Sequence, residues 1–389
     1  MRAALFAYGF RPMFLLCGIG GLVLVPWWAL YYVAGAALAT RWPPTLWHAH
    51  EMLFGFIGAA IAGFLLTAVP SWTGQKGFAG RPLWILSGLW ILARIAIATS
   101  RFWPVGLPQL LDLAFMPALF YLIAPPLLRE RNRNTPLLLV LIGLWLMNVL
   151  FHVAVLRQDP PLASRLMIVA IDIAVLLVSV IGGRIVPAFT ASGLRASGVE
   201  IALNSRAWLT RIAVGSMVVV AVGDAVLPDT RVAGVVAAVA SACQVLRLSQ
   251  WVVRRVWRHP IIWVLHLAYG WIPVALALKA LALLSGLALG AFWLHALTIG
   301  AISTMIMGVM TRASLGHTGR RLVASPAIAM AYGLISVAGV VRVFGLALLP
   351  LPYPLVIVLA ALAWTLAFGI FVAIYGPILW LPRVDGKPG

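Results

Sequence analysis

The chain has 389 residues, of which 63% are hydrophobic and only 10% are charged, and its mean hydropathy is +1.05. A soluble globular protein carries about 25% charged residues, so this composition excludes a water-soluble fold and indicates an integral membrane protein. The formal net charge is +19, but the basic residues lie in short gaps between long apolar runs, which favours contact with lipid over nucleic acid. Cys17 and Cys243 lie far apart in apolar stretches, which argues against a disulfide framework or a thiolate metal site.

Along the chain, twelve apolar stretches are long enough to cross the hydrocarbon core, which takes about 20 residues of helix. Runs of this length exclude barrel strands, which need about 10 alternating residues each. The predicted fold is therefore all-α, a polytopic transmembrane helical bundle of about 12 spans, with residues 1–389 forming a single integral-membrane domain. The predicted spans start near Phe14, Leu46, Leu83, Leu107, Pro136, Leu166, Trp208, Arg231, Ile261, Phe292, Pro326 and Leu355.

The distribution of lysine and arginine predicts the orientation of the chain. The N-terminus, the gaps after even-numbered spans and the tail hold 17 of these residues, whereas the gaps after odd-numbered spans hold five. Cytoplasmic loops retain positive charge, so both termini are predicted to be cytoplasmic.

Several charged residues lie in or at the ends of the predicted spans, where an ionised side chain costs roughly 2.5–3.5 kcal/mol. Each therefore pairs with an opposite charge, extends to the interface, or has a function. We expect Arg211, Arg247 and Lys279 to extend to the interface. The full set is Arg94, Asp112, Asp172, Arg184, Arg211, Asp224, Arg247, Lys279 and Arg342.

The predicted orientation divides the histidines into two groups. The outer, periplasm-facing group comprises His48, His50, His152 and His295, and the cytoplasmic group comprises His259, His266 and His317. A single membrane histidine often forms a hydrogen bond between helices. Four histidines at one depth of the membrane also fit a haem or copper site, because imidazole is a preferred ligand of haem iron and of copper. Both interpretations stay open on this pattern alone.

The segment WHAHE, from Trp47, constrains how its histidines act. On a helix, His48 and His50 are about 200° apart, so they cannot serve one small metal site if both are helical. Either they serve two different sites, or one of them belongs to a non-helical segment after the two preceding prolines. Glu51 lies about 60° round from His48, where it could orient that imidazole or accept protons.

Three further features carry polar or metal-binding side chains. Met305, Met307 and Met310 in span ten suit reduced copper, but methionine is also a common core filler. The following gap places His317 among arginines and glycines, which partly reflects the positive charge of cytoplasmic loops but could also bind a propionate or a phosphate. Glycines and a proline around Arg184 in GGRIVPAF predict an indentation at a helix end.

Several long motifs resemble the NnrS family. They are FRPMFLL from Phe10, WHAHEMLFGF from Trp47, AGFLLTAVPSWTG from Ala62, GGRIVPAFT from Gly182, HLAYGW from His266 and HALTIGAISTMIMGVMTRASLGHTGR from His295. The resemblance implies a twelve-span protein of the bacterial inner (cytoplasmic) membrane that contains haem and copper. It further implies a role in denitrification and in the response to nitric oxide.

We therefore hypothesise a haem b- and copper-binding membrane protein that acts in nitric oxide metabolism or resistance, as a nitric oxide-directed oxidoreductase with an unknown electron donor. In this hypothesis the metal or haem ligands are His48, His50, His152 and His295. Glu51 orients a ligand or accepts protons, and Arg94 and Arg101 neutralise haem propionates. Further cofactor-binding residues are His266 and His317.

Two alternatives use the same sequence differently. A secondary transporter would line a substrate path with the intramembrane charges, although the two halves show no corresponding broken helices. A non-catalytic protein that senses nitric oxide or handles metal would keep the ligands without turnover. Haem and copper content separates the first alternative from the hypothesis, and consumption of nitric oxide separates the second.

Overall fold

A computed structural model of the protein describes residues 4–387 apart from 197, 202, 204, 288–289 and 349–350. These residues form helices and no strand. Twelve helical segments are long and apolar enough to cross a membrane, so the chain is a multi-pass membrane protein, and the predicted number of spans is confirmed. The predicted and observed starts differ most at the sixth span, which begins at Pro160 rather than near Leu166.

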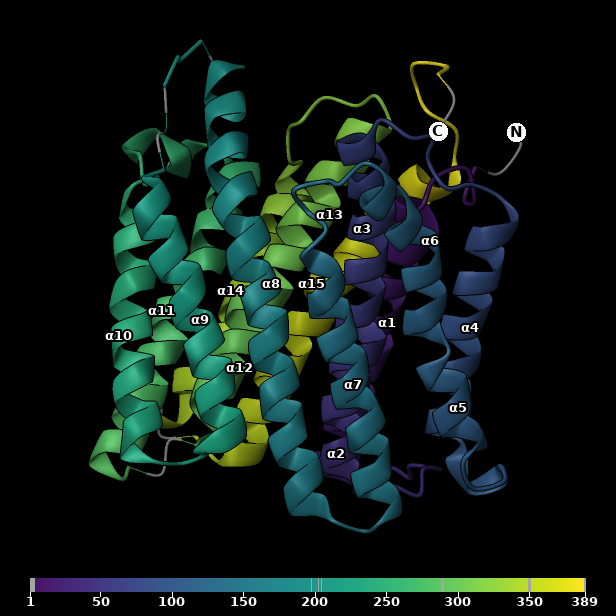
Figure 1. The fold of residues 1–389 in the computed structure, drawn as a ribbon, viewed down its shortest axis with the longest axis vertical. Coiled ribbons are helices and arrows are strands. Elements are labelled where there is room, and N and C mark those ends of the chain that lie inside the picture. Colours follow the sequence, from purple (N-terminus) through teal and green to yellow (C-terminus); the bar gives the residue numbers. More distant parts are fainter. Residues whose placement is uncertain are drawn as a thin grey trace. The chain divides into compact units, whose positions relative to one another are not determined.

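The helices follow one another along the chain with short connections (Figure 1). In chain order they are α1 (Phe10–Ala34), α2 (Pro44–His50), η1 (Glu51–Ile57), α3 (Gly58–Thr73), α4 (Arg81–Ala98), η2 (Ser100–Phe102), α5 (Leu107–Leu113), α6 (Phe115–Arg129), α7 (Leu137–Leu156), α8 (Pro160–Arg195), α9 (Ala207–Val226), α10 (Arg231–Ser249), η3 (Arg254–Arg258), α11 (Pro260–Ser285), α12 (Gly290–His295), η4 (Ala296–Ser303), α13 (Thr304–His317), α14 (Pro326–Leu348) and α15 (Tyr353–Trp380).

The chain divides into two compact units. The first unit contains residues 1–167, 310–321 and 364–389, and the second contains residues 168–309 and 322–363. Helices α8, α13 and α15 are therefore divided between the two units. The interpretation of the chain as one domain stays a prediction.

In the first unit, α1 packs closely against neighbouring helices through small residues. A Cβ at Gly63 on α3 would lie 2.5 Å from the ring of Phe14, and a Cβ at Gly21 would lie 2.8 Å from the ring of Phe368. Larger side chains at either position would separate the helices.

In the second unit, α11 packs against α10, η4 and α14. A Cβ at Gly300 would lie 2.4 Å from the Trp271 ring, and a Cβ at Gly308 would lie 2.8 Å from Leu265. These glycines let bulky side chains of α11 lie directly against the span that contains η4 and α13.

Two cations that the sequence predicted at the interface are buried in this unit instead. Arg247 Nη1 donates to Ser179 O at 2.9 Å and to the Tyr269 hydroxyl at 3.0 Å. Lys279 forms an ion pair with Asp224. Polar partners on neighbouring helices thus hold both side chains inside the protein, and the prediction was wrong for them. Arg211 is exposed on α9.

The glycine motif GGRIVPAF has a packing role that the structure makes clear. A Cβ at Gly183 would lie 1.9 Å from Arg247 Nη2, so only glycine leaves room for that buried guanidinium. The neighbouring Gly182 lies against the ring of Tyr269.

Two spans change from α-helix to π-helix directly after a histidine. The π-helix η1 follows His50, and the π-helix η4 follows His295. A π-turn contains more residues than an α-turn, so it changes which side chains share a face, and such turns are frequent at functional sites.

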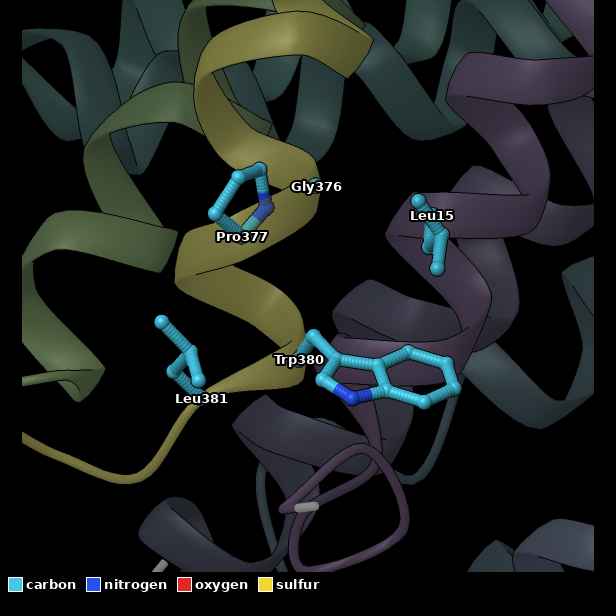
Figure 2. A pocket seen from close by; sticks show the side chains of 5 residues that line it. All are labelled: Leu15, Gly376, Pro377, Trp380 and Leu381. Atoms are coloured by element: carbon cyan, nitrogen blue, oxygen red, sulfur yellow. The ribbon is translucent and has the colours of Figure 1, made fainter. Parts of the chain in front are cut away.

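A buried cation on α1 holds the C-terminal end of α15. Arg11 Nη1 donates to the carbonyl oxygens of Ile378, Leu379 and Leu381 at 3.3, 3.0 and 2.7 Å. The last carbonyls of a helix lack partners within it, so a cation there satisfies them. Beside this junction Trp380 extends from α15 toward α1 (Figure 2). It borders a shallow apolar groove of about 450 Å³ that is lined by Leu15, Gly376, Pro377, Trp380 and Leu381.

The segment after α15 is anchored through Arg383. Its Nη1 donates to His317 O at 2.8 Å, and its Nε and Nη2 donate to the Asp385 carboxylate at 2.8 and 2.6 Å. These hydrogen bonds to Arg383 hold the pKa of Asp385 well below its usual range.

Candidate metal centre

His50, the last residue of α2, lies at the centre of a buried polar cluster in the first unit. Its side chain has no exposed surface. The Trp42 ring meets it edge-on at 4.9 Å between centroids, the Phe151 ring stacks on it at 5.2 Å, and Phe54 lies 5.1 Å away. These aromatic rings separate the cluster from lipid and water.

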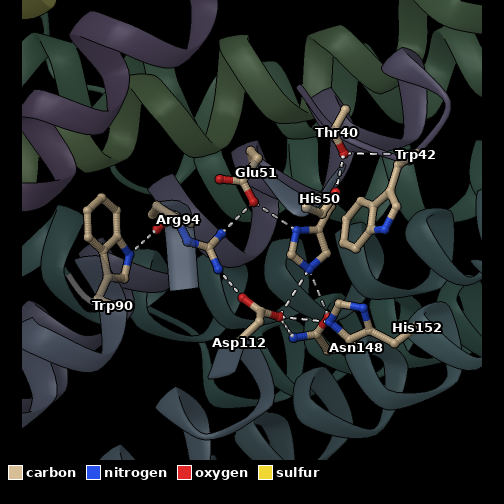
Figure 3. Close-up of polar contacts among 11 residues, drawn as sticks. Thr40, Trp42, His50, Glu51, Trp90, Arg94, Asp112, Asn148 and His152 are labelled. Carbon is tan, nitrogen blue, oxygen red and sulfur yellow. Dashed lines mark hydrogen bonds and ion pairs between the residues drawn. The ribbon is translucent and has the colours of Figure 1, made fainter. Parts of the chain in front are cut away.

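Three side chains from three helices converge in this cluster (Figure 3). His50 Nε2 lies 3.1 Å from Asp112 Oδ2, and His152 Nε2 lies 3.0 Å from the same oxygen. One ligand atom from each of these residues lies within 4.8 Å of the other two. Asp112 is on α5 and His152 is on α7, so packing of α2, α5 and α7 creates the arrangement.

A second layer of polar side chains holds the His50 and Asp112 side chains in place. Glu51 Oε1 lies 3.1 Å from His50 Nδ1 and accepts a hydrogen bond from Arg94 Nη1 at 2.8 Å. Arg94 Nη2 donates to the other oxygen of Asp112, Oδ1. Asn148 Nδ2 donates to Asp112 Oδ2 at 2.7 Å. Every carboxylate oxygen of Asp112 is therefore engaged.

The close approach of Arg94 depends on Gly55 in η1. A Cβ at this position would lie 2.8 Å from Arg94 Nη1 and 3.1 Å from its Cδ. The Gly55 carbonyl also accepts a hydrogen bond from Trp90 Nε1 at 2.9 Å. Trp90 and Arg94 lie one turn apart on α4, so that helix is held against η1 at two levels.

The charges of the cluster do not balance. With neutral imidazoles, the carboxylates of Glu51 and Asp112 exceed the single guanidinium of Arg94 by one negative charge. A buried uncompensated charge is costly, so the cluster requires one further positive charge.

The hydrogen-bond pattern indicates that the additional positive charge is needed at the His50 imidazole. Its Nδ1 faces a Glu51 oxygen and its Nε2 faces an Asp112 oxygen. A neutral imidazole has one N–H group and can donate to only one of these oxygens. Either a second proton on His50 or a metal ion beside Nε2 satisfies both contacts.

The donor set suits a transition-metal ion. Two imidazoles and a carboxylate are ligands that copper, zinc and iron accept. Glu51 at His50 Nδ1 is the carboxylate partner that commonly orients a metal-bound histidine. His152 Nδ1 is buried and has no hydrogen-bond partner among the described residues, so this imidazole still has an unused nitrogen.

The comparison with protein families adds independent information. A family model described as NnrS protein matches residues 4–383, which is nearly the whole chain. The chain belongs to the NnrS family. The resemblance predicted from motifs such as WHAHEM and HALTIG is therefore confirmed. No curated protein matches the chain.

In this NnrS-family chain, the histidines of WHAHE contact different partners, as their angular separation predicts. His48 stacks on the Trp28 ring at 4.7 Å between centroids, whereas His50 faces Asp112. The position of Glu51 on the helix predicts a contact with His48, whereas its Oε1 contacts His50 and Arg94.

The other proposed histidines lie outside the cluster. His295 ends α12 in the second unit, so its meeting with the outer histidines stays a prediction. His266 Nδ1 lies 3.2 Å from Ile262 O and its Nε2 lies 3.3 Å from Trp251 O, so both nitrogens already face backbone carbonyls. His317 lies against the rings of Tyr8 and Phe10, at 5.9 and 5.5 Å between centroids.

The two arginines proposed for propionates have protein partners. Arg94 faces the carboxylates of Glu51 and Asp112. Arg101 is exposed in η2, and its Nε donates to Thr40 O at 3.1 Å.

The sequence pattern does not point to a site at two residues of the cluster. Asp112 stands out in the sequence only as a charge inside a span, and Asn148 does not stand out. The available signal was a polar side chain within an apolar run near the same outer end as His152, which is four residues after Asn148 on α7.

Proposed function

We propose that His50, Asp112 and His152 bind one copper ion and that the protein acts on nitric oxide in the membrane. The convergence of the three donor atoms within 4.8 Å, in a buried site that lacks one positive charge, carries this proposal. Membership of the NnrS family suggests a protein of the nitric oxide response.

The side chains around the ligands would prepare this site for the ion. Glu51 fixes the proton of His50 on Nδ1, which leaves the Nε2 lone pair directed toward Asp112 and His152. Arg94 and Asn148 hold the Asp112 carboxylate in one orientation. Bound copper would supply one-electron redox chemistry.

The enclosure of the cluster suits nitric oxide as a ligand or substrate. The molecule is small and uncharged, so it partitions into the bilayer and needs no polar channel. The rings of Trp42, Phe54 and Phe151 around His50 provide an apolar approach and keep water away from the ligands. The bacterial inner membrane is part of the proposal and follows from the family resemblance.

Haem does not fit the cluster itself, because aromatic rings and His152 surround the His50 imidazole and leave no face open to a macrocycle. We keep haem b as a second, non-covalently bound cofactor of the proposal. Its candidate axial ligand within the first unit is His48, which is only half-buried and lies outside the cluster.

Metal analysis of purified variants tests the copper site. We expect the full-length protein, expressed with copper, to contain about one copper ion, and His50→Ala and His152→Ala to lose it. Glu51→Gln should keep the ligands but weaken copper affinity roughly 10- to 100-fold, as loss of a partner of a metal-bound histidine commonly does. Copper content by mass spectrometry and the paramagnetic resonance spectrum of the oxidised protein provide the measurements.

His48→Ala is the matched control, because it removes a neighbouring imidazole that faces Trp28 rather than Asp112. Its copper content should equal that of the wild-type protein. Wild-type protein that folds but binds no copper would refute the site and leave a metal-free ion-pair network around protonated His50. Consumption of nitric oxide by the reduced, copper-loaded protein then separates an enzyme from a sensor or metal-handling protein.

A further inference from the structure

A second charged cluster lies within the second unit and contains none of the ligands of the proposed copper site. Lys279 on α11 forms an ion pair with Asp224 on α9. The Lys279 Nζ also lies 4.5 Å from the centroid of the Trp293 ring on α12. All three side chains are buried.

Asp172 on α8 completes this cluster. Its side chain has no exposed surface, and the charged groups that act on it are Asp224 and Lys279. No donor group of the described residues reaches either oxygen of Asp172, whereas the carboxyl group of Asp224 is in hydrogen-bonding contact with it. A buried carboxylate that lacks donors is a costly arrangement.

The cluster therefore contains two carboxylates and one ammonium. If all three groups were ionised, one negative charge would remain uncompensated inside the apolar bundle. Two adjacent carboxyl groups in such surroundings commonly share one proton, because both cannot ionise at low cost. One bound proton makes the cluster neutral.

A metal cation would neutralise the excess negative charge less well than a proton. Hard cations take about six or more oxygen ligands. Among the described residues, the acidic side chains of the cluster are Asp172 and Asp224, and the Asp224 carboxylate already binds the Lys279 ammonium. A proton needs a single oxygen and a nearby acceptor.

We infer that Asp172 and Asp224 form a proton-binding site, in which the two carboxyl groups share one proton beside Lys279 at neutral pH. Ionisable residues inside spans often carry protons through membrane proteins. This site makes the second unit able to take up and release one proton, independently of the metal chemistry proposed for the first unit.

Infrared spectroscopy of the full-length protein in lipid tests this site. The wild-type protein at pH 7 should show the carbonyl stretch of a buried protonated carboxyl group, which shifts in deuterated water. Asp172→Asn should abolish that band, because the remaining Asp224–Lys279 pair is neutral. Lys279→Met should intensify it, because two carboxyl groups without a cation both retain protons.

Asp229→Asn is the matched control, since Asp229 is exposed, lies five residues from Asp224, and has a positive φ of 57° that asparagine tolerates. It should leave the band unchanged. As a second measurement, the thermal unfolding midpoint of the wild-type protein should fall as the pH rises and the folded state loses its proton. This fall should be smaller in Asp172→Asn.

Two results would overturn the inference. One is a band that persists in both Asp172→Asn and Asp224→Asn, which would place the proton elsewhere. The other is a wild-type protein without the band whose unfolding midpoint rises with sodium concentration and loses this dependence in Asp172→Asn, because a metal ion would then supply the charge.

Discussion

Gly55 illustrates how a residue without a side chain supports the candidate metal centre. It allows Arg94 to reach both Glu51 and Asp112, and its carbonyl accepts the hydrogen bond of Trp90. Arg94 in turn offsets one of the two buried carboxylates. A larger residue at this position of η1 would therefore displace Arg94 and disturb the polar cluster.

We expect Gly55→Ala to destabilise the protein by about 1–3 kcal/mol, because the new Cβ would meet a guanidinium that two ion pairs hold in place. The free energy of unfolding in mixed detergent measures this effect. Gly88→Ala on α4 is the control, since a Cβ there would meet nothing within 4 Å. That substitution should be neutral or stabilising by about 0.5–1 kcal/mol, and equal losses in both variants would contradict the packing argument.

At the scale of the helix, the end of α15 depends on a residue far from it in sequence. Arg11 on α1 donates to three carbonyl oxygens in and just beyond the last turn of α15. Arg383, in the segment after α15, donates a further hydrogen bond to the carbonyl oxygen of His317 at the end of α13. These contacts connect the two ends of the described chain within the first unit.

Arg11→Met should therefore free the last turn of α15. A buried carbonyl without a partner costs about 1–3 kcal/mol, so amide exchange near Leu379 and Leu381 should accelerate while the middle of α15 stays protected. Hydrogen exchange followed by mass spectrometry measures this change. Arg133→Met, at an exposed position between α6 and α7, should leave these amides unaffected. Unchanged exchange in Arg11→Met would show that other contacts fix this end.

At the scale of the whole molecule, twelve candidate spans with an excess of positive charge in alternate gaps predict one orientation in the membrane. A membrane protein exposes different faces to two compartments, so its orientation decides from which side the proposed copper ion and proton would reach the buried clusters. The bias of 17 basic residues against five predicts both termini on the cytoplasmic side.

Cysteine labelling in intact cells tests this orientation. In a variant without Cys17 and Cys243, a cysteine at Arg157 should react with a membrane-impermeant reagent added outside. Cysteines at Arg131 and Arg320 should react only after the membrane is opened. Labelling of Arg131→Cys in intact cells would reverse the predicted orientation.

The sequence by itself determined the class of fold and the number of spans. The hydrocarbon core requires about 20 apolar residues with internal hydrogen bonds, and this requirement is visible in each stretch without reference to the others. It also predicted that His48 and His50 cannot serve one small metal site if both are helical, because their angular separation depends only on local helix geometry. The family followed from the residues of WHAHEM and HALTIG.

Only the tertiary structure decided which polar side chains meet. His50, Asp112 and His152 come from separate helices, and their meeting depends on how those helices rotate and pack, which local periodicity does not specify. The burial of Lys279 and Arg247 follows the same rule, since a cation stays inside the bundle when neighbouring helices bring it a polar partner. Contacts between distant segments therefore converted isolated intramembrane charges into two distinct clusters.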